Sequence, residues 1–380
     1  MSKSTFDNEV RSSFLSMKMR VRPYILFAVT ALFSACLALS AQAQTAISAV
    51  NGFDSLVRNY NAVVLNNATF SNSNMEGAIA VRGNLTTSSG SIAYKTSVYA
   101  NSSDPTLYVG GQLKISGETK LQSGYAALPN SAGSFVTVNG SQRHFLTTTG
   151  GKLNLDNLQN PLAKTSPTTN PTPANWNWAS IESTAISLSS QLAAAAVTGT
   201  IGVNTGNQTL TFSPNSTDAG VVVFNFDASL LNGNSYGGQN FSNLKFNIGS
   251  DQTFVVNVLN ANDKTLIGQG VNFNTSSFVG AGGADQLLWN ITGSGNVTLM
   301  GSGDFYGSIL APEATLSNGS GRVEGQILAG GLTYSNAQLH YNDFSPTAVL
   351  VPEPGTYALW TLGLCVAGLV WHRRRRAARR

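Results

Sequence analysis

The chain has 380 residues, of which 11% are charged, and it carries a formal net charge of +4. Most of the positive charge lies in the two terminal segments, because residues 44–350 hold 11 Lys and Arg against 15 Asp and Glu. This core therefore lacks the basic footprint of a nucleic-acid-binding domain, and we expect no nucleic-acid partner. The only cysteines, Cys36 and Cys365, lie outside the core, which excludes a disulfide framework and a thiolate metal site there.

The N-terminus has the three parts of a secretory signal peptide. A basic segment precedes an apolar run over residues 24–39, and Ala41 and Ala43 then form a small-x-small cleavage site. We predict that signal peptidase removes residues 1–43. The alternative is an uncleaved membrane anchor, but the run is shorter than the ~20 residues that a spanning helix needs.

The first part of the core is predicted to be β structure. Residues 51–160 contain short β-branched and apolar runs, such as 61–65 and 78–81, separated by Gly, Ser and Asn. Four prolines then fall within residues 161–175. Since proline fixes φ and removes a backbone donor, we predict a loop or linker there.

One helix is predicted over about residues 178–197. Its apolar residues recur at steps of four, three and four: Ile181, Ala185, Leu188 and Leu192. Gly199 suits the end of this helix. We expect Trp176 and Trp178 to pack the helix against the sheet, because large aromatic side chains dominate cores; the alternative is a ligand platform.

An asparagine flanked by apolar residues recurs in the β-rich segment 200–344, at Asn225, Asn247, Asn257 and Asn290. Because side chains alternate across a strand, each Asn points away from its apolar neighbours. The spacings of 22, 10 and 33 residues share no period. We therefore favour an ordinary solvated face, and the alternative is a stacked asparagine ladder.

A weak internal repeat indicates the architecture. Residues 75–79 (Met-Glu-Gly-Ala-Ile) recur as residues 323–327 (Val-Glu-Gly-Gln-Ile), with a third partial copy at 307–312. Gly307 and Gly325 are 18 residues apart, about one turn of a stacked β-coil. We predict a mainly β fold, a β-helix or solenoid with one packed helix; a β-sandwich is the alternative.

The tail, residues 351–380, has three ordered features. Pro352, Glu353 and Pro354 precede an almost wholly apolar run over residues 356–371. A basic cluster follows it: Arg373, Arg374, Arg375 and Arg376. We predict a short transmembrane helix whose arginines keep the C-terminus in the cytoplasm. This arrangement resembles the PEP-CTERM sorting signal of Gram-negative bacteria, which implies that an exosortase recognises the Pro-Glu-Pro motif. The alternative is a simple tail anchor.

The core itself, residues 44–350, resembles the choice-of-anchor A family. The resemblance is carried by residues 61–85, 287–290, 307–312, 324–326 and the closing segment 339–344. It implies a surface-exposed domain next to an anchoring signal. It implies no defined molecular activity.

Few residues point to catalysis or to a cofactor. His144 and His340 are the only histidines of the core, and neither has a His, Cys or Glu at metal-ligand spacing. Glu76 and Glu324 occupy equivalent repeat positions, where we favour two capped turns over a catalytic carboxylate pair. We therefore expect no enzyme activity, no catalytic residues, no cofactor and no metal site.

Taken together, these features predict an exported surface or biofilm-matrix protein that adheres to exopolysaccharide or to neighbouring surfaces. The alternative is a secreted β-helical enzyme that degrades polysaccharide. A weaker alternative is ice binding by a flat β-helix face. That function needs regular Thr-x-Thr rungs, and Thr209-Leu210-Thr211 stands nearly alone in the sequence.

Overall fold

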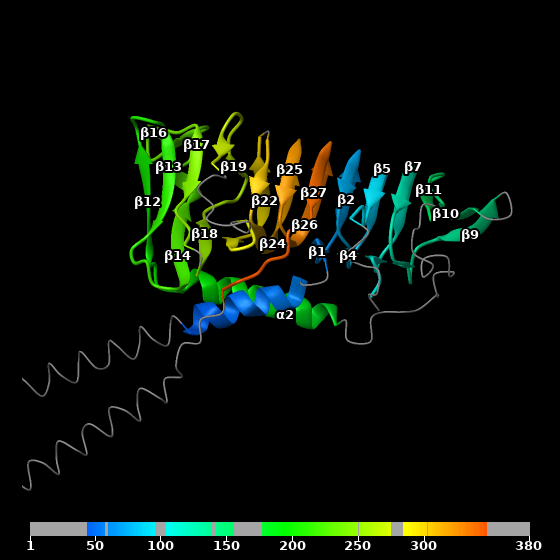
Figure 1. Cartoon of the computed structure of the whole chain (residues 1–380). Coiled ribbons are helices and arrows are strands. Elements are labelled where there is room, and N and C mark those ends of the chain that lie inside the picture. The colour runs from blue at the N-terminus through cyan, green and yellow to red at the C-terminus, as the bar shows by residue number, and fades with distance from the viewer. Residues whose placement is uncertain are drawn as a thin grey trace, which may run out of the picture. The chain divides into compact units, whose positions relative to one another are not determined.

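The computed structural model describes residues 44–57, 60–95, 104–138, 142–155, 177–249, 251–274, 284–301 and 303–347. Most strands in these ranges pair in parallel with strands of neighbouring coils, and together they form one large sheet. Figure 1 shows the strands stacked side by side along one axis. The predicted β-solenoid is confirmed, whereas a sandwich would be built from antiparallel sheets.

Each coil passes through three faces of the solenoid. The first is the helix-covered face, which is formed by β14 (Gly220–Asp227), β18 (Gln252–Leu259), β21 (Leu287–Ile291), the first parts of β24 (Ser308–Asn318) and β26 (Ile327–Ser335), β1 (Ala62–Val64), β4 (Ile79–Val81), β6 (Leu107–Val109) and β8 (Ala126–Ala127).

The second is the hydroxyl face, which is formed by β19 (Lys264–Ile267), β22 (Gly295–Met300), the second parts of β24 and β26, β2 (Ala68–Ser71) and the first parts of β5 (Leu85–Ile92) and β7 (Leu113–Leu121). The third is the charged face, which is formed by β23 (Phe305–Tyr306), β25 (Gly321–Glu324), β27 (Ala337–His340), β3 (Ser73–Met75), the second parts of β5 and β7, and β11 (Lys152–Asn154).

The two ends of the solenoid carry further strands. One end holds β12 (Gly199–Asn204), β13 (Thr209–Pro214), β17 (Asn243–Phe246) and β20 (Asn272–Phe273), together with η3 (Ala228–Leu230) and the small pair β15 (Ser235–Tyr236) and β16 (Gln239–Asn240). The other end holds the hairpin of β9 (Gly133–Val138) and β10 (Gln142–Thr147).

The order of the coils in space differs from their order in the sequence. Strand β1 pairs on one side with β4 and on the other with β26, so the first coil lies against the last. We call this contact between the first and last coils the seam. The coils of residues 62–154 stack on one side of the seam, and the coils of residues 220–340 stack on the other side. The seam is closed by hydrogen bonds from the Asn61 side chain to the carbonyls of Gly325 and His340.

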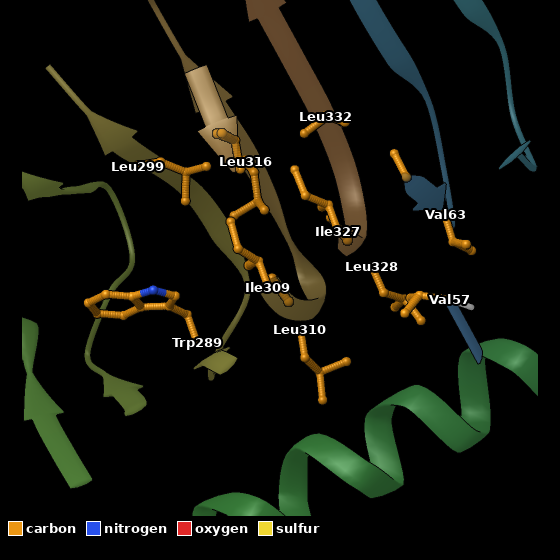
Figure 2. Close-up of a cluster of buried hydrophobic side chains, with 14 of the residues drawn as sticks. Val57, Val63, Trp289, Leu299, Ile309, Leu310, Leu316, Ile327, Leu328 and Leu332 are labelled. Carbon is orange, nitrogen blue, oxygen red and sulfur yellow. The ribbon is translucent and has the colours of Figure 1, made fainter. Parts of the chain in front are cut away.

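The helix-covered face is buried on both sides. Figure 2 shows Leu310 and Leu328 directed toward a helix, while Ile309 and Ile327 point into the solenoid. Strands with two buried faces read as continuous apolar runs rather than as alternating ones. This explains why the sequence of these segments does not by itself separate sandwich from solenoid.

Two helices cover this face, where the sequence predicted one. Helix α2 (Trp178–Ala193) begins at Asn177, whose side chain accepts a hydrogen bond from the Ser180 amide, and it ends four residues before the predicted limit. Trp178 packs on Tyr108 with ring centroids 5.8 Å apart, as expected, and Trp176 lies outside the described residues. The second helix, over residues 44–57, was not predicted from the sequence.

Three of the four recurrent asparagines form a ladder beside α2. The prediction of a solvated face is wrong for Asn257 and Asn290, which are fully buried, whereas Asn225 at the end of the ladder is exposed. Asn225, Asn257 and Asn290 are aligned by strand register. The Asn290 amide donates to the Asn257 side chain (2.8 Å) and to the Ser189 carbonyl (2.9 Å). Asn257 donates to the Leu192 carbonyl (2.8 Å) in the last turn of the helix, a carbonyl that also accepts from the Ala195 amide (3.2 Å).

The fourth asparagine fits the solvated prediction, because Asn247 is exposed and bonds Ser213. The period of the ladder is given by the intervals from Asn225 to Asn257 and from Asn257 to Asn290, which are 32 and 33 residues. Each of them is one coil of this half of the solenoid. The spacings of 22, 10 and 33 residues hid this period, because they include Asn247, which is not part of the ladder.

Candidate functional site

Short hydroxyl side chains form a continuous outward row on the hydroxyl face. Strand register places them in one line across six neighbouring described strands: Thr265, Thr298, Ser317, Thr333, Thr69 and Thr86. The row ends at Lys114, which is paired with Thr86. We call the six residues the hydroxyl ladder.

The ladder is regular because the backbone fixes it. Neighbouring strands lie about 4.8 Å apart, so each hydroxyl follows the previous one at that interval. Thr298 and Ser317 are within hydrogen-bond distance of each other, at 3.0 Å. Threonine is branched at Cβ and has few χ1 rotamers, which keeps the row ordered without a ligand. No member of the ladder carries a charge.

The ladder crosses the seam between the two halves of the solenoid. Thr333 on β26 is paired with Thr69 on β2, and Ser335 with Ser71 in the same strand pair. A second column of hydroxyls therefore begins at the seam, where each strand reads Thr-x-Ser. The centre of this surface exists only when the first and last coils are docked.

The ladder was not predicted from the sequence, because the expected pattern was two threonines within one strand. In most of the six strands the ladder hydroxyl lies between two buried residues, as in Val297-Thr298-Leu299 and Leu332-Thr333-Tyr334. This alternation of one outward hydroxyl with buried neighbours is the sequence pattern from which the ladder could have been predicted. The six ladder strands contain no Thr-x-Thr pair, as the sequence indicated, and the regular row runs across the strands instead.

The charged face contrasts with this row. His340 lies between the two repeat-equivalent glutamates, with Nδ1 2.9 Å from Glu324 Oε1 and 4.0 Å from Glu76 Oε1. Glu76 accepts from the Tyr341 amide (3.0 Å), and Glu324 accepts from the Asn342 side chain (2.8 Å). Each glutamate therefore bonds the segment after β27, in agreement with the structural role predicted for them.

The electrostatics of this group are mutually stabilising. The hydrogen bond to Glu324 raises the pKa of His340, and the charges of Glu324 and Glu76 add to the rise although burial opposes it. Burial pushes the pKa of Glu324 upward, but the His340 hydrogen bond and the charges of His340 and Arg322 outweigh it and lower that pKa. The group links β25, β27 and the end of β3, so it also spans the seam.

Within the described residues, no group of three or more His, Cys, Asp and Glu side chains is placed to hold a metal ion. Among the same residues, no helix is long and apolar enough to cross a membrane. The predicted cleavage residues Ala41 and Ala43, the motif Pro352-Glu353-Pro354, the apolar run 356–371 and Arg373 to Arg376 lie outside the described ranges, as does the proline-rich loop 161–175.

Two family models match the chain. Residues 53–341 match a family described as "Putative Ice-binding-like adhesive domain", and residues 350–376 match the PEP-CTERM protein-sorting motif. The sorting motif thus agrees with the resemblance seen in the tail. The model over the core has a different description from choice-of-anchor A, and that resemblance stays a prediction. A search of curated proteins finds no match.

Solved structures with a similar chain include three ice-binding proteins. A glycosylated ice-binding protein from an Arctic yeast (LeIBP) is 12% identical, with 78% of this chain and 95% of that chain covered and a TM-score of 0.29. The ice-binding protein of the Antarctic ascomycete Antarctomyces psychrotrophicus is 11% identical, with 75% and 95% covered and a TM-score of 0.31. The DUF3494 domain of Shewanella frigidimarina ice-binding protein_1 is 14% identical, with 76% and 95% covered and a TM-score of 0.29.

Proposed function

The chain belongs to the ice-binding-like adhesive domain family and carries a PEP-CTERM protein-sorting motif, and from this premise we propose that it is an exported, non-enzymatic adhesin of a Gram-negative cell surface. The proposed ligand is exopolysaccharide, bound on the hydroxyl face. The observation that carries the proposal is the hydroxyl ladder, an ordered and uncharged row that no other described element covers.

The chemistry of the ladder fits a neutral, hydroxyl-rich polymer. Each Thr or Ser hydroxyl both donates and accepts hydrogen bonds, as sugar hydroxyls do. A single such bond exchanges for one with water and contributes little net free energy. A row of equivalent groups gains strength by binding many sugar units of one chain at once, since the later contacts are intramolecular.

The ladder can be tested with a matched pair of double variants. Thr69→Lys with Thr333→Lys places two charges on adjacent strands at the centre of the hydroxyl face. The control, Asn74→Lys with Gln338→Lys, places two charges on adjacent strands of the same two coils, at exposed positions of the charged face. We expect the first pair to weaken binding to the purified exopolysaccharide of the source cells by roughly tenfold or more, about 1.4 kcal/mol, and the control to bind like wild type.

Equal binding by both double variants would show that the hydroxyl face is not the adhesive surface. The same incubation should be assayed for new reducing or unsaturated chain ends. We expect none from the wild-type protein. Their appearance would favour the polysaccharide-degrading alternative, for which Glu76 and Glu324 are the carboxylates to replace, since catalysis there needs two such groups.

Ice is a second candidate ligand, and the regular ladder is the observation that favours it. A flat lattice of ordered hydroxyls offers a repeating template to ordered water. Measuring thermal hysteresis and ice recrystallisation with the same variants separates the two ligands. Activity in these assays that Thr69→Lys with Thr333→Lys abolishes, together with no polysaccharide binding by wild type, would favour ice.

We propose that an exosortase processes the tail at Pro352-Glu353-Pro354. Proline fixes its own φ and disfavours a helical conformation in the preceding residue, which keeps this segment extended for a transpeptidase. Replacing the three residues by alanine should retain the full-length chain in the inner membrane. Mass spectrometry of the mature wild-type protein should find no peptides from 370–380; finding them would make the tail a permanent anchor.

A further inference from the structure

Both ends of the solenoid finish in an antiparallel hairpin on the same face. At one end β11 pairs in parallel with β7 of the charged face and leads through β10 to β9. At the other end β20, β17 and β13 lead to β12, and Phe273 of β20 contacts Phe305 of β23 on the charged face, with ring centroids 5.6 Å apart. Figure 1 shows β9 and β12 at opposite ends.

These two outermost strands have open edges. In the described part of the chain, β9 pairs only with β10 and β12 pairs only with β13. Edge strands are normally protected from other chains by charged residues, prolines or bulges. Neither sequence, Gly-Ser-Phe-Val-Thr-Val in β9 nor Gly-Thr-Ile-Gly-Val-Asn in β12, contains a charge or a proline. Phe135 in β9 is 42% exposed.

The directions of the two edges are complementary. β9 runs the same way as the coils, because it is antiparallel to β10, which is itself antiparallel to β11. β12 runs against the coils, because it is antiparallel to β13, which is parallel to β17. Two copies stacked along one axis in the same orientation would therefore meet as an antiparallel pair, which has the more stable hydrogen-bond pattern.

From these edges we propose that copies of the protein stack end to end, with β9 of one copy added to β12 of the next. Both strands have six residues, so a full pairing sets Thr137 opposite Thr200. The main-chain hydrogen bonds of β-strand addition provide the contact. A head-to-tail interface that does not close extends into a filament. In such a filament the charged face and the adjacent hydroxyl ladder of one copy are followed along the axis by those of the next copy.

Cysteine cross-linking of the full-length chain on cells tests the pairing. The background is a chain in which Cys36 and Cys365 are replaced by Ser. Thr137→Cys together with Thr200→Cys should give, after mild oxidation, a series of dimers, trimers and larger species. Each single variant should stay monomeric alone, and the two mixed should give dimers. Dimers from either single variant alone would mean that like edges pair, which overturns the head-to-tail arrangement.

A second measurement does not depend on the strand register. Phe135→Lys with Thr137→Lys charges the β9 edge, while Ala179→Lys with Thr184→Lys adds the same charge to the exposed side of α2. Sedimentation of the protein released from the cell surface should show filaments for wild type and for the α2 control, and a shift of roughly tenfold or more in favour of monomers for the β9 variant. Monomeric wild-type protein at every concentration tested would refute the proposal.

Discussion

The helix-covered face and the hydroxyl face are built from the same coils yet serve opposite purposes. Strand β24 contributes to both: its first part supplies Leu310, which points toward a helix, and its second part supplies Ser317, which belongs to the ladder. The parallel pairing is the same on both faces. The difference lies in the residues that point outward.

This difference shows how a solenoid separates stability from binding. Outward residues that pack on helices remove apolar surface from water, and their loss costs folding free energy. Outward hydroxyls on an uncovered face lose little solvation on folding, so they contribute little to stability. These regularly spaced hydroxyls are therefore free to bind a ligand without a cost to folding.

The sharpest way to test this separation uses the two residues of β24. Leu310→Ala leaves a cavity under the helices and should lower the free energy of unfolding by about 2–5 kcal/mol. Ser317→Ala removes an outward hydroxyl and should change it by no more than about 0.5 kcal/mol. Denaturant unfolding of both variants measures the contrast. A comparable loss from Ser317→Ala would contradict the division between the faces.

The asparagine ladder is the polar part of the helix-covered face, and its loss should have the next largest effect. Asn290→Ala removes the partner of the buried Ser189 hydroxyl and of the Asn257 side-chain oxygen, and it also removes a bond to the Ser189 carbonyl. An unpaired buried polar group costs about 1–3 kcal/mol, and we expect a destabilisation of about 2–3 kcal/mol. The control is Asn247→Ala at the exposed position, with about 0.5 kcal/mol or less. Thermal unfolding of the two variants provides the test.

The group around His340 should make the seam sensitive to pH, with the smallest effect of the three. Because the pKa of His340 is raised in the folded protein, its contribution is fully present below the ordinary value of about 6.5 and is lost as the pH rises through the higher folded value. The charged groups facing it are Glu324, Glu76 and Arg322. Stability should therefore fall as the pH rises above about 6.5.

The variant His340→Gln checks this assignment. It keeps a hydrogen-bonding side chain but cannot titrate, so the part of the stability change that begins near the ordinary histidine pKa should disappear. Unfolding measured at several pH values compares it with wild type. An unchanged pH profile in His340→Gln would assign the dependence to other groups.

Local patterns in the sequence were sufficient for the mainly β character of the core and for α2. The i, i+3, i+7 spacing of Ala185, Leu188 and Leu192 identified the buried side of the helix, and all three are buried. The repeated Glu-Gly turns around Glu76 and Glu324 indicated stacked coils. These signals are local, because periodicity and turn chemistry depend on residues within one coil.

The tertiary structure alone decided which coils are neighbours. No local pattern shows that β26 lies against β2, and that pairing brings Thr333 to Thr69 and completes the ladder. The same holds for Asn290 and Ser189, which are 101 residues apart and meet only when α2 docks. Strand pairing is set by hydrogen bonds and packing between distant segments, so the binding face and the polar ladder become visible only once the chain has closed on itself.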